Sequence, residues 1–145
     1  MMKYKIGLIL LLFLVFVACG KDKNPTSSLP SFGYESFHSG CKGTSGTEKL
    51  TINSSNDSIQ VVHLNADYNS CAEIKVEVKK TDYGFDLFEK DEGTTCEGTC
   101  DSDVTTIIHK LSGGRYLIRV FGTGGNSVGQ GYVEVQPRED DGPQG

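Results

Sequence analysis

Short runs of alternating apolar and polar residues, separated by glycine-rich and polar turns, most strongly constrain the fold of this chain. The clearest run, Glu73 to Lys79, places Ile74, Val76 and Val78 on one face and charged residues on the other. Such period-two alternation is typical of a half-buried β-strand. Similar runs predict strands at residues 49–52, 58–66, 85–88, 105–111, 116–121 and 132–135. Seven short strands with regular turns indicate a β-sandwich or a barrel. We predict the all-β class with a single antiparallel β-sandwich of about seven to eight strands.

One of these runs changes its alternation midway. In residues 58–66, Ile59 and Val61 share one parity, whereas Val62, Leu64 and Ala66 share the other. An extra residue in one strand of a pair produces such a switch. The sequence therefore predicts a β-bulge at Val61 and Val62.

The first residues have the composition of an export signal. Lys3 and Lys5 precede an apolar run over residues 6–17, which is shorter than the ~20 residues that span a bilayer. The end of this run and Cys19 resemble the lipobox of bacterial lipoproteins. That resemblance implies a signal peptide at residues 1–18, cleavage before Cys19 and lipid attachment to Cys19. We predict an extracytoplasmic protein anchored by lipid in a membrane of the bacterial cell envelope. Plain secretion and an uncleaved membrane anchor are the alternatives.

The composition then divides the rest of the chain into three parts. Residues 19–33 contain prolines and a Thr-Ser-Ser run with little to bury, which is typical of a tether. Residues 34–136 carry the strand patterns and form the predicted β-sandwich domain. Residues 137–145 are polar and contain proline and glycine, so we expect a flexible tail.

Five cysteines bear on how the domain is held together. If Cys19 carries lipid, an even number remains, namely Cys41, Cys71, Cys96 and Cys100. Disulfides persist outside the cytoplasm, and four cysteines allow three connectivities. We favour Cys96–Cys100, which would close a short glycine-containing loop, together with Cys41–Cys71. A zinc site is disfavoured because the spacing lacks paired Cys-x-x-Cys knuckles.

The charge balance excludes one class of partner. The chain has 14 Lys and Arg against 19 Asp and Glu, with a formal net charge of −5 at pH 7. Loss of residues 1–18 would remove two lysines and leave the mature chain more acidic. An acidic surface repels phosphate backbones and anionic head groups. We therefore expect no nucleic-acid binding, and we expect the membrane to be a partner only through the lipid anchor.

Three segments resemble the bacterial pre-peptidase C-terminal domain. They are Gly84 to Phe88, Leu111 to Val120 with its Leu-x-x-Gly-x-Tyr-x-x-Arg-Val pattern, and Gly131 to Val135. The resemblance covers residues 47–136. It implies a jelly-roll-like sandwich with no catalysis of its own. Some members of that family bind calcium, collagen or insoluble polymers.

Calcium is the one cofactor that the sequence suggests. Carboxylate oxygens suit this hard cation, and an acidic stretch supplies four candidate ligands: Asp86, Asp91, Asp101 and Asp103. No complete calcium-binding loop motif is present, so solvated acidic loops are the alternative interpretation.

A second candidate site follows from strand parity. If Phe85, Leu87, Ile118 and Val120 face the core, the alternate side chains face outward. The outward set comprises Phe88, Leu117, Arg119, Phe121 and Tyr132. Aromatic side chains around an arginine are typical of a binding surface. Alternatively, a loop or residues 34–37 cover this face.

Nothing in the motifs indicates an enzyme. His38, His63 and His109 fall on separate segments, and neither a Gly-x-Ser-x-Gly elbow nor a His-Glu-x-x-His helix occurs. We expect His63 and His109 on the polar faces of strands. The predicted function is a non-catalytic binding module for a protein or polymer, with a protein or polysaccharide outside the cytoplasm as the expected partner. A structural accessory subunit of a cell-envelope complex is the alternative, and a hydrolytic enzyme is a weaker one.

Overall fold

The structure is a computed structural model that describes residues 32–43 and 46–136. The predicted signal peptide, Cys19, most of the tether and the tail at 137–145 lie outside the described residues. Within the described part of the chain, no helix has the length and apolar character needed to cross a membrane.

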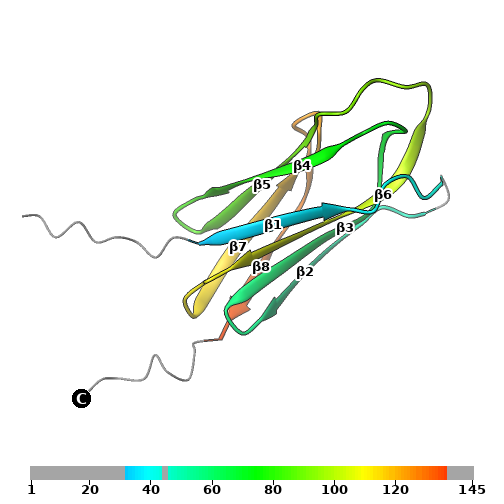
Figure 1. Cartoon of the computed structure of the whole chain (residues 1–145). Helices are drawn as coiled ribbons and strands as arrows, with labels where there is room; N and C mark the ends of the chain where they lie inside the picture. The colour runs from blue at the N-terminus through cyan, green and yellow to red at the C-terminus, as the bar shows by residue number, and fades with distance from the viewer. Residues whose placement is uncertain (1–31, 44–45, 137–145) are drawn as a thin grey trace, which may run out of the picture.

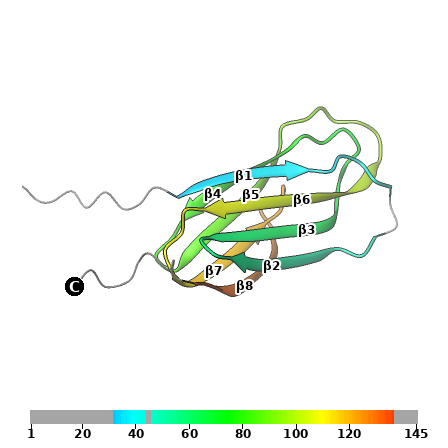
Figure 2. The same ribbon diagram turned by 60° about the horizontal axis from the view of Figure 1, so that its bottom comes forward.

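The described residues form two four-stranded sheets that pack face to face as a β-sandwich, which confirms the predicted fold class (Figure 1). One sheet has the strand order β1-β6-β3-β2, and Figure 2 shows these strands side by side. The other sheet has the order β4-β5-β7-β8. The strands are β1 (Gly33–His38), β2 (Lys49–Ser55), β3 (Ser58–Asn69), β4 (Ile74–Lys80), β5 (Gly84–Asp91), β6 (Thr99–His109), β7 (Gly114–Phe121) and β8 (Ser127–Val135).

One strand pair departs from the predicted antiparallel arrangement. β5 and β7 run parallel, with Phe85 opposite Ile118 and Phe88 opposite Phe121. The chain leaves β5, passes through β6 in the other sheet and returns as β7. The chain direction therefore reverses twice between β5 and β7, so these two neighbouring strands run parallel.

The core lies between the inner faces of the two sheets. Alternate residues of each strand enter it, so the burial pattern of β4 and β5 has the period of two that the sequence predicts. Burial of each large apolar side chain contributes about 1.5–3 kcal/mol. The largest fully buried apolar side chains are Phe85, Ile59, Leu87, Ile108, Ile118, Val120 and Val135.

The predicted bulge in β3 lies at a different place. The register of β3 against β6 shifts between His63 and Ala66, and Asn65 has a positive φ of 50°. Because His63 occupies the next core position after Val61, the inward parity continues to His63 and changes only then. Placement of the bulge at Val61 and Val62 is therefore wrong, since a polar residue takes a buried position.

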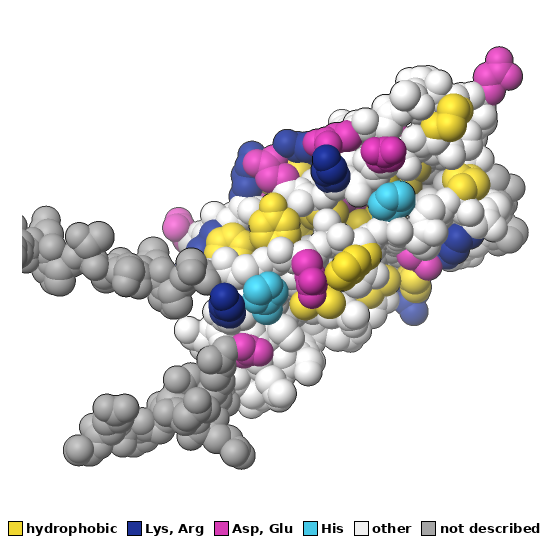
Figure 3. Space-filling view, in the orientation of Figure 1, with side chains coloured by type: hydrophobic (Ala, Val, Ile, Leu, Met, Phe, Trp, Pro, Cys, Tyr) yellow, Lys and Arg dark blue, Asp and Glu magenta, His cyan; other side chains and the backbone are white. Residues whose placement is uncertain are grey.

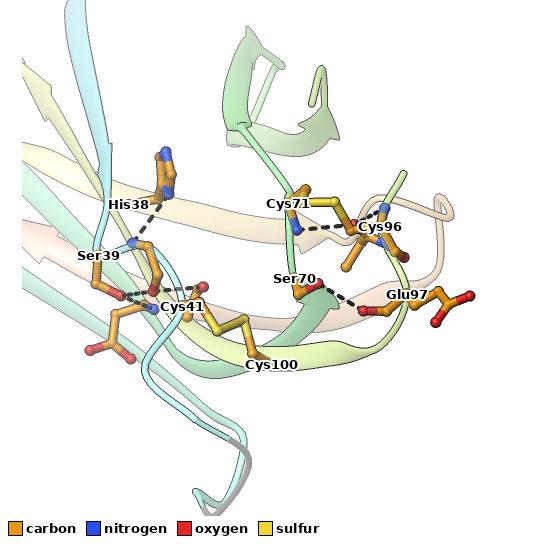
Figure 4. Close-up of a disulfide and its surroundings, with 12 residues drawn as sticks. His38, Ser39, Cys41, Ser70, Cys71, Cys96, Glu97 and Cys100 are labelled. Carbon is orange, nitrogen blue, oxygen red and sulfur yellow. Dashed lines mark hydrogen bonds between the residues drawn. A yellow bond between two sulfur atoms is a disulfide. The ribbon is translucent and has the colours of Figure 1, made fainter. Parts of the chain in front are cut away.

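The disulfide pairing also differs from the one favoured on sequence grounds. Cys41 pairs with Cys100, with their Cα atoms 5.5 Å apart, and Cys71 pairs with Cys96, with their Cα atoms 5.6 Å apart (Figure 4). After Gly98, which has a positive φ of 87°, the chain enters β6 and Cys100 points inward. Cys100 therefore faces the segment that follows β1, the neighbour of β6 in the sheet.

A side-chain amide holds the second disulfide in place. Asn69, the last residue of β3, accepts hydrogen bonds from the backbone N–H groups of Cys71 and Cys96, both at 3.0 Å. Its Nδ2 donates to the Cys96 carbonyl at 2.7 Å. The hydroxyl of Ser70 donates to the Glu97 carbonyl at 3.1 Å in the same region (Figure 4). The β3–β4 turn and the loop before β6 are thus joined by a covalent bond and three of these hydrogen bonds, since the bond from the Cys71 N–H lies within the turn.

Candidate binding site

The five residues predicted to face outward lie on one face of the β4-β5-β7-β8 sheet. Phe88 is opposite Phe121 across β5 and β7, and Leu117 is opposite Tyr132 across β7 and β8. The side chains that alternate with them on β5 and β7, namely Leu87, Ile118 and Val120, are buried in the core. We call this set, Phe88, Leu117, Arg119, Phe121 and Tyr132, the aromatic face.

Ring contacts order the aromatic face. The rings of Phe88 and Phe121 stack with their centroids 4.9 Å apart and their planes at 11°. The Lys79 ammonium lies 4.9 Å from the centroid of Phe88. Tyr132 is 61% exposed, and the guanidinium of Arg115 lies 4.1 Å from its ring centroid. Stacked and cation–π contacts of this kind fix ring orientation without removing the rings from solvent.

Arg119 lies in a two-bond ion pair at the middle of the face. Its Nε and one terminal nitrogen each donate to a separate carboxylate oxygen of Asp86, both at 2.7 Å. The hydrogen bond to Asp86 raises the pKa of the Arg119 guanidinium. The pair neutralises the centre of the face, because Asp86 and Arg119 are directly opposite each other in the β5–β7 register.

The N-terminal segment does not cover the aromatic face. β1, which contains residues 34–37, pairs with β6 in the other sheet, so residues 34–37 do not form that cover. On the side of the molecule that includes β1, hydrophobic side chains lie in separate groups among charged and histidine side chains (Figure 3). Acidic and basic side chains adjoin over β4 and β5, where Glu77 pairs with Lys90.

The candidate calcium ligands lie apart and are held by protein donors. Asp101 and Asp103 belong to β6 in one sheet, whereas Asp86 and Asp91 belong to β5 in the other. Asp86 is paired with Arg119. Asp91 accepts hydrogen bonds from two backbone N–H groups. Asp101 accepts from the N–H of Gly46 at 2.7 Å. Lys42 and the backbone of Asn65 bind Asp103 and lower its pKa. Among the described residues, no group of three or more metal-ligating side chains forms a site.

The structure contains a buried ionic cluster between the two sheets that the sequence analysis does not predict. His63 of β3 and Glu89 of β5 are each 3% exposed, and Nδ1 of His63 lies 2.9 Å from a carboxylate oxygen of Glu89. The hydroxyl of Tyr68 donates to the other Glu89 oxygen at 2.5 Å. Nε2 of His63 lies 2.8 Å from the exposed carboxylate of Glu48. The expectation that His63 lies on a polar strand face is therefore wrong.

Electrostatics within this cluster favour a charged imidazole. Burial opposes protonation of His63, but hydrogen bonds and charges from Glu89 and Glu48 raise its pKa above the usual value. Burial and the Glu89 charge also raise the pKa of the Tyr68 hydroxyl, which keeps it protonated as a donor. Both ring nitrogens of His63 have carboxylate partners, so neither is placed to accept a proton from a nucleophilic hydroxyl. This geometry suits a structural ion pair.

We expect the cluster to make stability fall as pH rises. A histidine with a raised folded-state pKa contributes stability that is fully present below its unfolded pKa of about 6.5 and is lost above the folded pKa. The free energy of unfolding should therefore decrease as pH rises from about 6.5 through the raised pKa of His63, measured by denaturant titration. The variant His63→Gln should flatten this dependence, whereas His109→Gln, which alters a half-buried histidine outside the cluster, should leave it unchanged. A wild-type profile that rises over this interval would contradict the ion pair.

In the described structure, the other two histidines form no hydrogen bond with this cluster. His38 lies across β6 from His63, because both are opposite Val104, and its Nδ1 accepts from the N–H of Gly40 at 3.3 Å. His38 is exposed on β1, and His109 is half-buried at the end of β6. The three histidines named as candidates for hydrolysis therefore do not share a site.

Comparisons with known proteins add no further constraint. No protein-family model, curated protein or solved structure matches this chain. The resemblance of residues 47–136 to the pre-peptidase C-terminal domain stays a prediction from the sequence.

Proposed function

We propose that this protein is a non-catalytic binding module, anchored outside the cytoplasm by lipid at Cys19, that binds a protein or polysaccharide through its aromatic face. The observation that carries the proposal is one sheet face with half-buried, stacked Phe88 and Phe121 at one end and the exposed Tyr132, opposite Leu117, at the other. Large aromatic side chains gain more by burial than most residues, so aromatic rings that stay partly in solvent on one sheet face are typical of an interaction surface.

Charge and rigidity support the same assignment. The central Arg119–Asp86 pair is already neutralised, so a partner need not supply a counter-charge to cover it. The face is built on strands rather than loops, and ring contacts hold Phe88, Phe121 and Tyr132 before any ligand arrives. Preorganised side chains lose little conformational entropy on binding.

The predicted tether is consistent with this role. Residues 19–33 would separate the sandwich from the membrane and allow the aromatic face to reach a polymer or protein in the envelope. The short spacing between Cys19 and β1 at Gly33 also limits that reach, so the partner should lie near the membrane.

The proposal predicts that truncation of the aromatic face weakens binding. The full-length chain, purified in detergent, is incubated separately with the polysaccharide and protein fractions of bacterial cell envelopes. Tyr132→Ala and Phe121→Ala together should weaken retention on one fraction by about tenfold or more. Tyr132→Ala alone should show a smaller loss, and it cannot disturb the core because its side chain is mostly exposed.

Phe37→Ala provides the matched control. Phe37 is 55% exposed, similar to Tyr132, but it lies on β1 in the opposite sheet. Retention that is unchanged in the aromatic-face variants, or that is lost equally in Phe37→Ala, would contradict the assignment. Retention of a single stoichiometric envelope protein would select the role of accessory subunit over polysaccharide binding.

A further inference from the structure

A small pocket lies at the end of the β4-β5-β7-β8 sheet, beside the aromatic face. It has a volume of about 310 Å³ and lies between the β4–β5 turn, the start of β7 and Tyr132 of β8. The residues that line it include Tyr83, Tyr132, Arg115, Lys80 and Asp82. This volume lies at the lower end of the range for ligand pockets, which is about 300–1,000 Å³.

Two tyrosine rings in this pocket remain in solvent. Tyr83 is 75% exposed and Tyr132 is 61% exposed. Among the described residues, these are the most exposed of the large hydrophobic side chains. Both line one pocket although they come from distant parts of the chain. The flat, electron-rich face of a tyrosine is a surface on which the C–H bonds of a sugar ring can pack.

The turn that carries Tyr83 is fixed by hydrogen bonds. The Tyr83 carbonyl accepts from the N–H of Leu117 at 2.8 Å, which ties the turn to β7. The N–H of Thr81 donates to the Gly84 carbonyl at 2.9 Å, and the Thr81 hydroxyl accepts from the N–H of Gly84 at 3.1 Å. A Cβ at Gly84 would lie 2.0 Å from the Leu117 carbonyl oxygen, so glycine permits this close approach. The pocket is therefore formed before a ligand binds.

The cations of the pocket differ from the other cations of this sheet. Lys75, Lys79, Lys90 and Arg119 each form an ion pair with a carboxylate. Among the described residues, neither Lys80 nor Arg115 has a carboxylate within 4.0 Å that would neutralise it. Arg115 instead lies over the ring of Tyr132. The lining side chains therefore carry two cations against the single carboxylate of Asp82, whereas Glu134, opposite Arg115 in the β7–β8 register, lies outside the lining.

We propose that this pocket binds an acidic sugar unit, such as a uronic acid residue of a polysaccharide. The sugar ring packs on Tyr83, and its carboxylate accepts charge-assisted hydrogen bonds from Arg115 and Lys80. Asp82 can accept a hydrogen bond from a sugar hydroxyl. The inference rests on the proposed function, because Tyr132 belongs to both the aromatic face and the pocket, and it names the ligand class.

The test uses the full-length chain in detergent and ligand-observed saturation-transfer NMR. The probes are trigalacturonate and the neutral oligosaccharide galactotriose, which differ mainly in the carboxylates. We expect saturation transfer to trigalacturonate only, weakened by added salt because a charge contact is involved. Tyr83→Ala and Arg115→Gln should each weaken binding by about tenfold, whereas Phe37→Ala should have no effect. Thermal melts identify any variant that fails to fold. If one of the two variants is unfolded, the other still tests whether the pocket binds the sugar.

Three outcomes would overturn the inference. Equal transfer to the neutral oligosaccharide would exclude an acidic sugar, and absence of transfer to both would exclude a sugar. Tighter binding of a short peptide through its C-terminal carboxylate would assign the pocket to peptides. The proposed function is judged separately by Phe121→Ala, since Phe121 does not line the pocket. If Phe121→Ala loses envelope retention and the wild-type chain does not bind trigalacturonate, the proposed function is supported and only the sugar inference fails.

Discussion

Replacement of Glu89 by alanine is expected to lower the free energy of unfolding by about 3–5 kcal/mol. Glu89 is buried between the sheets and is the shared partner of His63 and Tyr68. Its removal leaves the Tyr68 hydroxyl without its carboxylate acceptor and the imidazole without its buried counter-charge. Breaking a buried ion pair on one side is among the most destabilising single changes, because the remaining polar groups stay desolvated. Chemical denaturation of the purified protein near neutral pH measures the effect.

A double variant distinguishes loss of the pair from loss of packing. His63→Leu combined with Glu89→Leu replaces both members by apolar side chains, and we expect it to be more stable than Glu89→Ala alone. Glu77→Ala serves as a surface control, since Glu77 pairs with Lys90 in solvent and such pairs contribute about 0–1 kcal/mol. A double variant as unstable as Glu89→Ala would contradict a structural role for the ion pair and would point to a tightly constrained cavity.

Removal of the Cys41–Cys100 disulfide is expected to cost about 4 kcal/mol, as chain-entropy estimates give for its sequence separation of 59 residues. The bond ties the segment after β1 to the start of β6, so its loss also frees one edge of the sheet. Cys41→Ser with Cys100→Ser should therefore lower the unfolding midpoint in denaturant. The corresponding pair, Cys71→Ser with Cys96→Ser, closes a 25-residue separation and should cost about 3.5 kcal/mol.

The connectivity itself can be tested with a mismatched pair of substitutions. Cys96→Ser with Cys100→Ser removes one cysteine from each disulfide, so it should destabilise more than either matched pair. If Cys96 were bonded to Cys100, the same variant would remove only a short loop and leave Cys41–Cys71 intact. Two free thiols in this variant support the observed pairing, and none would contradict it.

The sequence predicts the strands whose burial is set by local alternation. β4 was expected at residues 73–79 and lies at Ile74–Lys80, because both of its faces follow a strict pattern. β1 was missed, since GYESFH contains mixed polar and aromatic residues and forms an edge strand that is only partly buried. The start of β6 was missed for a related reason: Thr99 to Asp103 are mostly polar, and tertiary contacts rather than propensity make them a strand.

Features that depend on contacts between distant segments could not be predicted from one sequence. Glu89 has the inward parity of Phe85 and Leu87, but a carboxylate is expected in solvent unless a buried partner is known. The disulfide pairing requires the β1–β6 register, because it places Cys41 beside Cys100. Nothing in the sequence distinguishes Tyr83 from other turn residues, because its role depends on the contact between its turn and β7.

The aromatic face could be predicted because it depends on parity alone. Once Phe85 and Ile118 face the core, Phe88 and Arg119 must face outward in strands without a bulge. The parallel β5–β7 register then determines which outward residues meet, and it pairs Phe88 with Phe121 and Asp86 with Arg119. The sequence predicts the members of the face, whereas the sheet order determines the stacking and the ion pair.

Site-specific photo-crosslinking in intact bacterial cells tests the central claim most directly. A benzophenone amino acid is introduced into the full-length chain in place of Tyr132 on the aromatic face, and in place of Phe37 on the opposite sheet as the control. Binding through the aromatic face predicts one dominant crosslinked product from position 132 and little or none from position 37. Products of equal yield from both positions, or a product from position 37 alone, would contradict it.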